Sequence, residues 1–328
     1  MAVSRKRGGA LSRCKIVIFD SLFPQLIGKH HLLNYEGEYP HMNIGSPDMA
    51  TNRLPSLHRI IIEPSKRRFY LNLRGIWEYR ELLLFLAWRD LKTRYAQTFL
   101  GFAWAIAQPV AMMLLFTLVF SSFAKLPSDG VPYPLFVYSA LLPWGYFSRS
   151  LDRSSFSIVA ESNLITKVYF PRIIVPISAT LVGLVDFVIA FLLLLVMMAL
   201  YGVMPSWEVI FIPLFLLLSV LITLAVSLWL AALFVRYRDI AAAMPLMTQI
   251  WMFATPVAYP SGLVPEQWKW LYNVNPMVGV VEGFRWALLK TPPPGLDSIA
   301  VTVVFASVLL LLGISCFNRM ERKFADVI

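Results

Sequence analysis

The chain lacks the residue sets that support most enzymatic chemistry. Its four histidines all precede residue 59, so the commonest general base is missing from the apolar remainder. The adjacent pair His30-His31 has no cysteine or spaced histidine beside it, a pattern typical of solvent-exposed histidines and not of a metal site. Motifs of the Gly-x-x-x-x-Gly-Lys-Ser/Thr, His-Glu-x-x-His and Gly-x-Ser-x-Gly types are missing. We therefore expect no catalytic residue, no metal and no cofactor in this chain.

One carboxylate, Asp186, lies well inside an apolar run, Leu181–Val188. An acid at membrane depth is a candidate for a transport pathway or a buried pair. The alternative is a structural hydrogen bond to a neighbouring helix, for which Thr180, Gln108 and Gln249 are the available partners. We find no basic partner within the apolar runs, and this favours the structural role over a proton relay.

A polar stretch, Glu161–Arg172, separates two long apolar runs. Pro171 disfavours helix in the residue before it, so a short helix from Ser162 is predicted to end near Phe170. Lys167 and Arg172 bracket an aromatic pair formed by Tyr169 and Phe170. This pattern indicates a docking knob for another protein, and the alternative is an ordinary basic loop between helices.

The composition indicates a membrane protein. Of the 328 residues, 58% are apolar and 15% are charged, against about 25% charged in an average soluble domain. The net charge is +10, and most of the excess of basic residues lies in the first 99. A basic front on an apolar body favours contact with anionic lipid over binding of nucleic acid. The two cysteines, Cys14 and Cys316, are interpreted as free thiols.

The residues that could do chemistry must be positioned by helices. Residues 1–75 form a polar tail without periodicity, and residues 76–328 form the membrane domain. From 77 to 97 apolar residues recur at helical spacing beside a charged face, which predicts an amphipathic helix in the membrane interface. The apolar face holds Leu84, Trp88, Leu91 and Tyr95, and the charged face holds Arg89, Asp90, Lys92, Thr93 and Arg94.

Six apolar runs follow, and we interpret them as membrane-spanning helices of an all-α polytopic protein. Their limits are 99–123, 133–151, 173–200, 209–235, 240–259 and 297–317. The segment 277–289 is too short to span, so it is predicted to be a re-entrant or interfacial helix. Glu282 and Arg285 would share one of its faces and could pair.

Basic residues near the ends of the runs predict cytoplasmic N- and C-termini. With six spans the cytoplasmic side receives Arg149, Arg153, Lys167, Arg172, Arg236, Arg238, Arg319, Arg322 and Lys323, and the outer side receives Lys125, Lys269, Arg285 and Lys290. The turn Arg236-Tyr237-Arg238-Asp239 joins the fourth and fifth runs, and Asp239 could cap the next helix.

Five short stretches taken together resemble one protein family. They are Ala87–Tyr95, Leu100–Pro109, Leu164–Arg172, Phe234–Asp239 and Asn275-Pro276, in this order. The chain resembles the membrane subunit of a bacterial type-2 ABC exporter of the polysaccharide kind, which moves O-antigen, capsule or teichoic-acid chains. The resemblance does not cover residues 1–75.

The resemblance implies a permease of the bacterial inner membrane, with no enzymatic activity of its own. Two copies of this chain would assemble with two ATP-binding subunits, which would hold ATP and Mg. A lipid-linked polysaccharide would pass along the interface between the two permease chains. The gate helix would contain Trp88, Arg89, Asp90, Lys92, Arg94 and Tyr95. The segment that couples to the ATPase would contain Glu161, Asn163, Leu164, Ile165, Lys167, Tyr169, Phe170, Pro171 and Arg172.

Aromatic side chains are the platforms we expect for a sliding sugar polymer, because pyranose faces are partly apolar. The available set is Trp104, Phe116, Phe120, Tyr138, Trp144, Tyr146, Phe147, Trp251 and Phe253. Packing or lipid contact is the alternative for each of them. Two other functions remain open, a membrane-embedded transferase acting on a lipid-linked sugar and an ATP-independent flippase.

Overall fold

A computed structural model describes residues 73–96 and 101–321, all within the unit Pro64–Ile328. The regular structure of this part of the chain is helical throughout. The four histidines, Cys14, Arg322, Lys323 and nearly all of the predicted tail lie outside the described residues. Cys316 is a half-buried free thiol.

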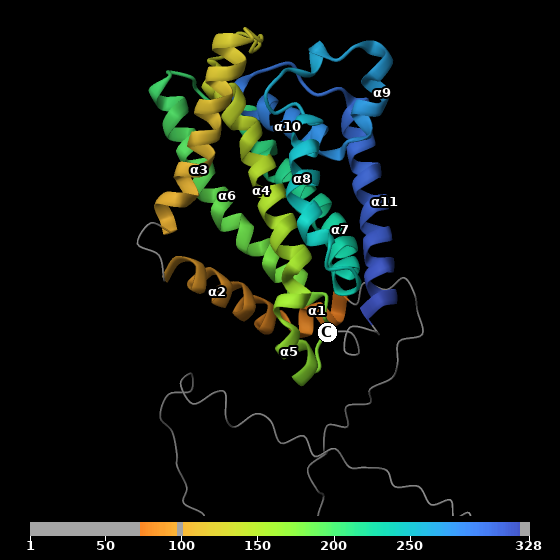
Figure 1. Cartoon of the computed structure of the whole chain (residues 1–328). Helices are drawn as coiled ribbons and strands as arrows, with labels where there is room; N and C mark the ends of the chain where they lie inside the picture. The colour runs from red at the N-terminus through yellow and green to blue at the C-terminus, as the bar shows by residue number, and fades with distance from the viewer. Residues whose placement is uncertain (1–72, 97–100, 322–328) are drawn as a thin grey trace, which may run out of the picture. The chain divides into compact units, whose positions relative to one another are not determined.

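The predicted amphipathic helix 77–97 is divided into two helices, α1 (Leu73–Glu78) and α2 (Arg80–Ala96). Helix α2 lies crosswise at one end of the other helices (Figure 1). Leu83 and Leu86 are buried against the protein, whereas Leu84 and Trp88 are exposed. Of the predicted apolar face, Leu84 and Trp88 are thus exposed, whereas Tyr95 donates to Asp186 of α6.

Four helical segments of the described chain are long and apolar enough to cross a membrane. The first is Ala103–Phe123, made of α3 (Gly101–Phe116) and a π-helical turn, η1 (Thr117–Phe123). The others are α6 (Ile174–Leu200), the 3₁₀ turn η2 (Trp207–Phe211) continued by α7 (Ile212–Arg236), and α11 (Leu296–Glu321). Each lies within a few residues of a predicted run.

Helix α4 (Tyr133–Ala160) is 28 residues long and continues nine residues past the predicted end at 151. It packs mainly against α6 and α7, with α10 and α3 beside it. Most of its side chains are buried by these neighbours, so it can carry charged residues that a lipid-facing helix could not. Arg149, Asp152 and Arg153 therefore belong to a helix and not to a cytoplasmic loop.

The fifth predicted run, 240–259, forms a shorter helix, α8 (Ile240–Phe253). A 3₁₀ turn, η3 (Ser261–Leu263), and two short helices follow, α9 (Glu266–Val274) and α10 (Pro276–Leu289). Asn275 caps α10, since its side chain accepts from the N–H of Met277, and Pro276 occupies the first helical position. Asn275 also accepts from Trp251 Nε1 at 2.9 Å and donates to Ala254 O at 3.1 Å. The Asn-Pro pair thus joins α8 to α10.

The prediction that Glu282 and Arg285 pair is wrong: the structure, which describes both residues, shows no ion pair between them. Arg285 is 3% exposed and donates to three backbone carbonyls, those of Phe136 (3.3 Å), Val257 (2.8 Å) and Tyr259 (3.3 Å). Its guanidinium also lies 3.6 Å from the centroid of the Phe136 ring. The arginine thus ties the carbonyls of Val257 and Tyr259, in the irregular segment after α8, to the Phe136 carbonyl of α4. Helical spacing could not reveal these acceptors.

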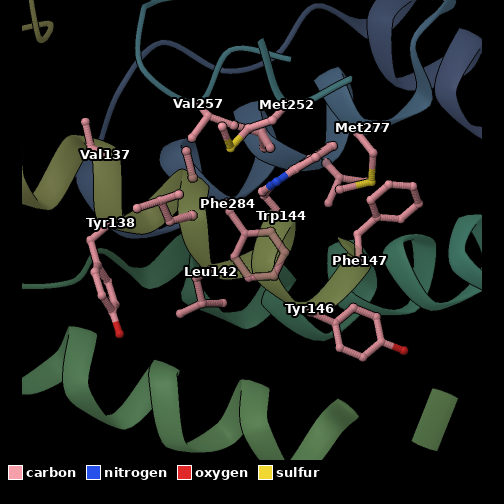
Figure 2. Packing of buried hydrophobic residues seen from close by; sticks show 14 of the residues in the cluster. Val137, Tyr138, Leu142, Trp144, Tyr146, Phe147, Met252, Val257, Met277 and Phe284 are labelled. Atoms are coloured by element: carbon pink, nitrogen blue, oxygen red, sulfur yellow. The ribbon is translucent and has the colours of Figure 1, made fainter. Parts of the chain in front are cut away.

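The main hydrophobic core is built around the aromatic face of α4. Figure 2 shows Trp144 and Phe147 of this helix beside Phe284 and Met277 of α10. The ring of Phe147 also meets that of Trp251 edge-on, with centroids 4.9 Å apart. At Gly313 of α11, an added Cβ would lie 2.4 Å from the carbonyl oxygen of Ala225 in α7, so glycine permits this close helix contact.

A second hydrophobic cluster lies at the end of the helices where α2 is found. It brings together α2, α4, α6, α7, α11 and α5 (Ser162–Lys167), the short helix that follows α4. Its buried members are Leu83, Leu86, Ile158, Ile165, Phe170, Ile173, Ile174, Val175, Leu228, Ala231, Ala232, Ile314 and Phe317. This cluster fixes α2 and α5 to the spanning helices.

Candidate functional site

A polar network at the α2–α5 end is centred on Asp186 of α6. The side chain is 3% exposed, and its carboxylate accepts hydrogen bonds from Arg94, from Tyr95 Oη at 2.6 Å and from Arg153 Nη2 at 3.0 Å. The predicted partners Thr180, Gln108 and Gln249 are therefore wrong, and so is the expectation that Asp186 has no basic partner. Two helices distant in sequence, α2 and α4, meet at this one carboxylate.

The electrostatics of Asp186 favour its ionised form. A buried carboxylate is costly unless it is paired and hydrogen-bonded, and here two guanidinium groups supply the countercharge. Tyr95, at the end of α2, completes the shell. Burial and the hydrogen bond to Asp186 raise the pKa of Tyr95 to about 12, so it stays a neutral donor. The arrangement holds the end of α2 against α6, and it offers no proton-relay chain.

A second ion pair joins α2 to the start of α5. Arg89 contacts both carboxylate oxygens of Glu161, with 3.1 Å between Nη1 and Oε2, and it also bonds Asp90. The hydrogen bond to Glu161 raises the pKa of Arg89, partly offset by burial. This two-pronged geometry fixes orientation as well as distance. Two members of the charged face of α2, Arg89 and Arg94, thus contact carboxylates of the protein, whereas Lys92 is exposed.

Helix α5 is anchored on one side and exposed on the other. Ile165 is buried and Leu164 half-buried, whereas Asn163 and Lys167 are exposed. The helix ends at Lys167 because the backbone is extended at Val168, three residues earlier than predicted.

The aromatic pair after α5 divides between the two environments. Tyr169 is 75% exposed, while Phe170 is 5% exposed in the second hydrophobic cluster. The expectation that both rings face a partner is therefore wrong for Phe170. The extended residue Val168 lets the chain turn this ring inward.

The far end of the same stretch is tied to α11. Arg172 donates from its backbone N–H to Glu321 Oε1 at 3.2 Å and from its guanidinium to the Glu321 carbonyl oxygen. Pro171, just before it, is half-buried. The stretch 161–172 is therefore held at both ends, by α2 through Glu161 and by α11 through Arg172.

Between α2, α4 and α6 the network lines a cavity of about 640 Å³. Its lining combines the charged side chains with an apolar floor of Phe156, Val175, Ala179 and Val182. The charged members are Arg89, Asp90, Arg94, Asp152, Arg153 and Glu161, three basic and three acidic. Because the charges are balanced, the cavity does not have the excess of positive charge expected of an anion-binding site. A joint between helices that can rearrange is the favoured interpretation.

The comparison with family models decides the assignment. The model described as ABC-2 type transporter matches residues 81–289, which include α2, α5 and α10. This chain belongs to the ABC-2 type transporter family.

Curated relatives of this ABC-2 transporter chain align along most of their length. An O-antigen export system permease protein RfbA from Myxococcus xanthus is 32% identical over 78% of this chain and 98% of the relative. A Klebsiella pneumoniae protein of the same name is 27% identical, covering 76% and 95%. The polysialic acid transport protein KpsM of Escherichia coli is 27% identical, covering 71% and 91%.

The other predicted surface residues of the ABC-2 transporter lie at the same end as α5 (Figure 1). Trp88 and Lys92 of α2 are exposed, as are the four residues of the turn Arg236–Asp239. The Arg236 guanidinium stacks 5.4 Å from the centroid of the Tyr237 ring. Asp239 precedes α8 but its side chain accepts no capping hydrogen bond, so the predicted cap is wrong.

The predicted aromatic set does not form one surface in the transporter. Five members are buried core residues, namely Phe116, Tyr138, Trp144, Tyr146 and Phe147. Phe120 and Trp251 are half-buried, and Trp104 and Phe253 are exposed. The buried rings pack against neighbouring helices, and only Trp104 and Phe253 of this set are exposed.

Two sets of site residues escaped the sequence reasoning. Arg153 was assigned to a loop, although no glycine or proline interrupts 146–170 and the Arg149/Arg153 spacing of four residues continues one helical face. Asn275 was noted only as part of a motif, although an Asn before Pro is a typical start of a helix. Both signals are local and were available in the sequence.

Proposed function

We propose that this transporter chain is the permease of a polysaccharide exporter in the bacterial inner membrane, driven by separate ATP-binding subunits. The observation that carries the proposal is the alignment with relatives named for O-antigen export and polysialic acid transport over at least 91% of their length. The cargo is a polysaccharide carried on a lipid. The chain itself performs no hydrolysis.

In this proposal α5 is the coupling helix. It exposes Asn163, Lys167 and Tyr169 to an ATP-binding subunit, while Ile165 and Phe170 anchor it in the permease. Nucleotide can drive transport only if the two permease states differ in their contact with that subunit. The stretch 161–172, which contains α5 and is tied to α2 at one end and to α11 at the other, is suited to transmit such a difference.

The proposed topology has six spans, with α4 and α8 added to the four long apolar segments. Helix α4 is long enough to cross and is shielded by its neighbours, and α8 is a 14-residue apolar helix extended by an irregular segment. Helices α9 and α10 are re-entrant on the outer side. Both termini are cytoplasmic, and α2 lies in the inner interface as a gate helix. Two copies of the chain assemble with two ATP-binding subunits.

A co-purification and activity assay tests the proposal. The permease is co-expressed with a candidate ATP-binding subunit from the same genome, purified with a tag on the permease alone, and assayed in lipid nanodiscs. We expect the subunit to be retained and to hydrolyse ATP, while the isolated permease does not. Deleting the permease gene should remove the surface polysaccharide. ATP hydrolysis by the permease alone, or full surface polysaccharide in the deletion strain, would contradict the proposal.

A further inference from the structure

Arg149 of α4 is a charged side chain at membrane depth that the network around Asp186 does not use. It lies one helical turn before Arg153, about 24 Å along α4 from Tyr133 at 1.5 Å per residue. Among the described residues none accepts a hydrogen bond or forms an ion pair with Arg149, and its side chain is half-buried. An intramembrane arginine without a partner indicates a functional site, because such a charge is costly to retain.

Arg149 points into a groove of about 250 Å³ between α3, α4 and α8. Helices α3 and α8 lie on either side of α4 in Figure 1. The polar lining comes from all three helices and consists of Gln108, Ser148, Arg149, Thr248 and Gln249. Gln108 and Gln249 are exposed, so the groove opens to the surface of the single chain.

The groove has the chemistry of an anion site. Its lining contains one guanidinium, two amides and two hydroxyls, and no Asp or Glu. The carboxylate whose field reaches Arg149, that of Asp186, already accepts from three donors. Arg149 is the one charged side chain in the lining of this groove, so the groove carries a positive charge. The Arg149 guanidinium fork, the Ser148 hydroxyl and the two side-chain amides match phosphate oxygens, whereas the Thr248 hydroxyl already donates to the carbonyls of Met244 and Pro245.

We propose that this groove binds the phosphate group of a membrane lipid, with Arg149 as the charged contact. In the proposed six-span topology α3, α4 and α8 all cross the bilayer, so the opening lies at membrane depth and the ligand must be carried by an amphiphile. This inference deepens the proposed function, on which it rests for a cargo carried on a lipid. The phosphate can come from an isoprenoid diphosphate carrier or from a bulk anionic phospholipid, and the experiment distinguishes these sources.

The test measures binding of farnesyl diphosphate to the full-length permease in phosphatidylcholine nanodiscs, with farnesol as the uncharged probe. We expect binding of the diphosphate and not of farnesol. Arg149→Gln should weaken the affinity ten- to hundredfold, the range for a lost charge-assisted contact, and Arg149→Lys should weaken it less. Arg238→Gln, the same change of charge on the exposed turn, is the matched control and should leave the affinity unchanged.

Equal affinity of Arg149→Gln and the wild type, or an equal loss in Arg238→Gln, would overturn the proposal. If Arg149→Gln does not purify as a folded protein, Gln249→Leu at the exposed edge of the groove must weaken binding instead, and unchanged affinity there overturns it. If bulk lipid occupies the groove, phosphatidylglycerol in the nanodiscs should abolish binding of farnesyl diphosphate. If the site prefers the isoprenoid diphosphate, phosphatidylglycerol should leave that binding unchanged. Both results support a phosphate site. The assay needs neither ATP nor export, so its failure is distinct from failure of the proposed function.

Discussion

At the scale of single residues, the loss of the Asp186 charge is expected to have a large electrostatic effect on stability. Asp186→Asn would leave Arg94 and Arg153 facing each other without a countercharge. Breaking a buried pair costs about 3–5 kcal/mol, and because the arginine side chains are about one-third exposed we expect the lower part of that range. Urea unfolding in detergent measures the loss. Asp239→Asn on the exposed turn is the control, and an equal effect of both changes would contradict the role of the network.

The neighbouring residues Tyr169 and Phe170 should respond in opposite ways to truncation. Phe170→Ala removes a buried ring and should lower the free energy of unfolding by about 3–5 kcal/mol. Tyr169→Ala removes an exposed ring, so stability should change by less than about 0.5 kcal/mol, while affinity for the ATP-binding subunit should fall roughly tenfold, as for an aromatic hot spot. Unfolding curves and a binding titration separate the two effects. Unchanged binding by Tyr169→Ala would remove this ring from the coupling surface.

At the scale of elements, the proposed coupling requires the pair Arg89–Glu161 to link α2 to the start of α5. Arg89→Gln, Glu161→Gln and the double variant should reduce ATP-driven export to a similar extent, because each change removes the same link. The coupling energy in a double-mutant cycle of unfolding should be about 1 kcal/mol for this half-exposed pair.

The matched control for that cycle is the exposed pair Arg74–Glu78 within α1. Its side chains are 90% and 59% exposed, so its removal should leave export unchanged and give a coupling energy near zero. Additive losses of export in the Arg89 and Glu161 variants would show that the two residues act separately, and the proposed link would fail.

The helices could be predicted from the sequence more securely than their contacts. The apolar runs placed most helices within a few residues. The partners of Asp186 lie 91, 92 and 33 residues away in sequence, so no local spacing could reveal them. Phe170 and Arg285 illustrate the same limit, since a ring or guanidinium is assigned to a surface or to a neighbour by packing that only the folded chain creates.

At the scale of the whole molecule, the number of spans decides which groups meet the ATP-binding subunit. If only the four long apolar segments crossed the membrane, the stretch that contains Tyr169 would lie on the side opposite the N-terminus. If α4 and α8 also cross, Tyr169 returns to the N-terminal side, with the turn Arg236–Asp239. The proposed coupling role of α5 therefore requires six spans.

Cysteine labelling distinguishes these topologies at two exposed positions. Tyr169 and Met204 are 75% and 78% exposed, and each is replaced by cysteine in a Cys14→Ser, Cys316→Ser background. With six spans and a cytoplasmic N-terminus, a membrane-impermeant maleimide should label Met204→Cys in spheroplasts and Tyr169→Cys only in inverted vesicles. With four spans the two positions exchange sides, because α4 no longer carries the chain across before α6. Trp268→Cys lies outside in both topologies and serves as the control for vesicle orientation. Labelling of Tyr169→Cys in intact spheroplasts would exclude α5 as the segment that the ATP-binding subunit contacts.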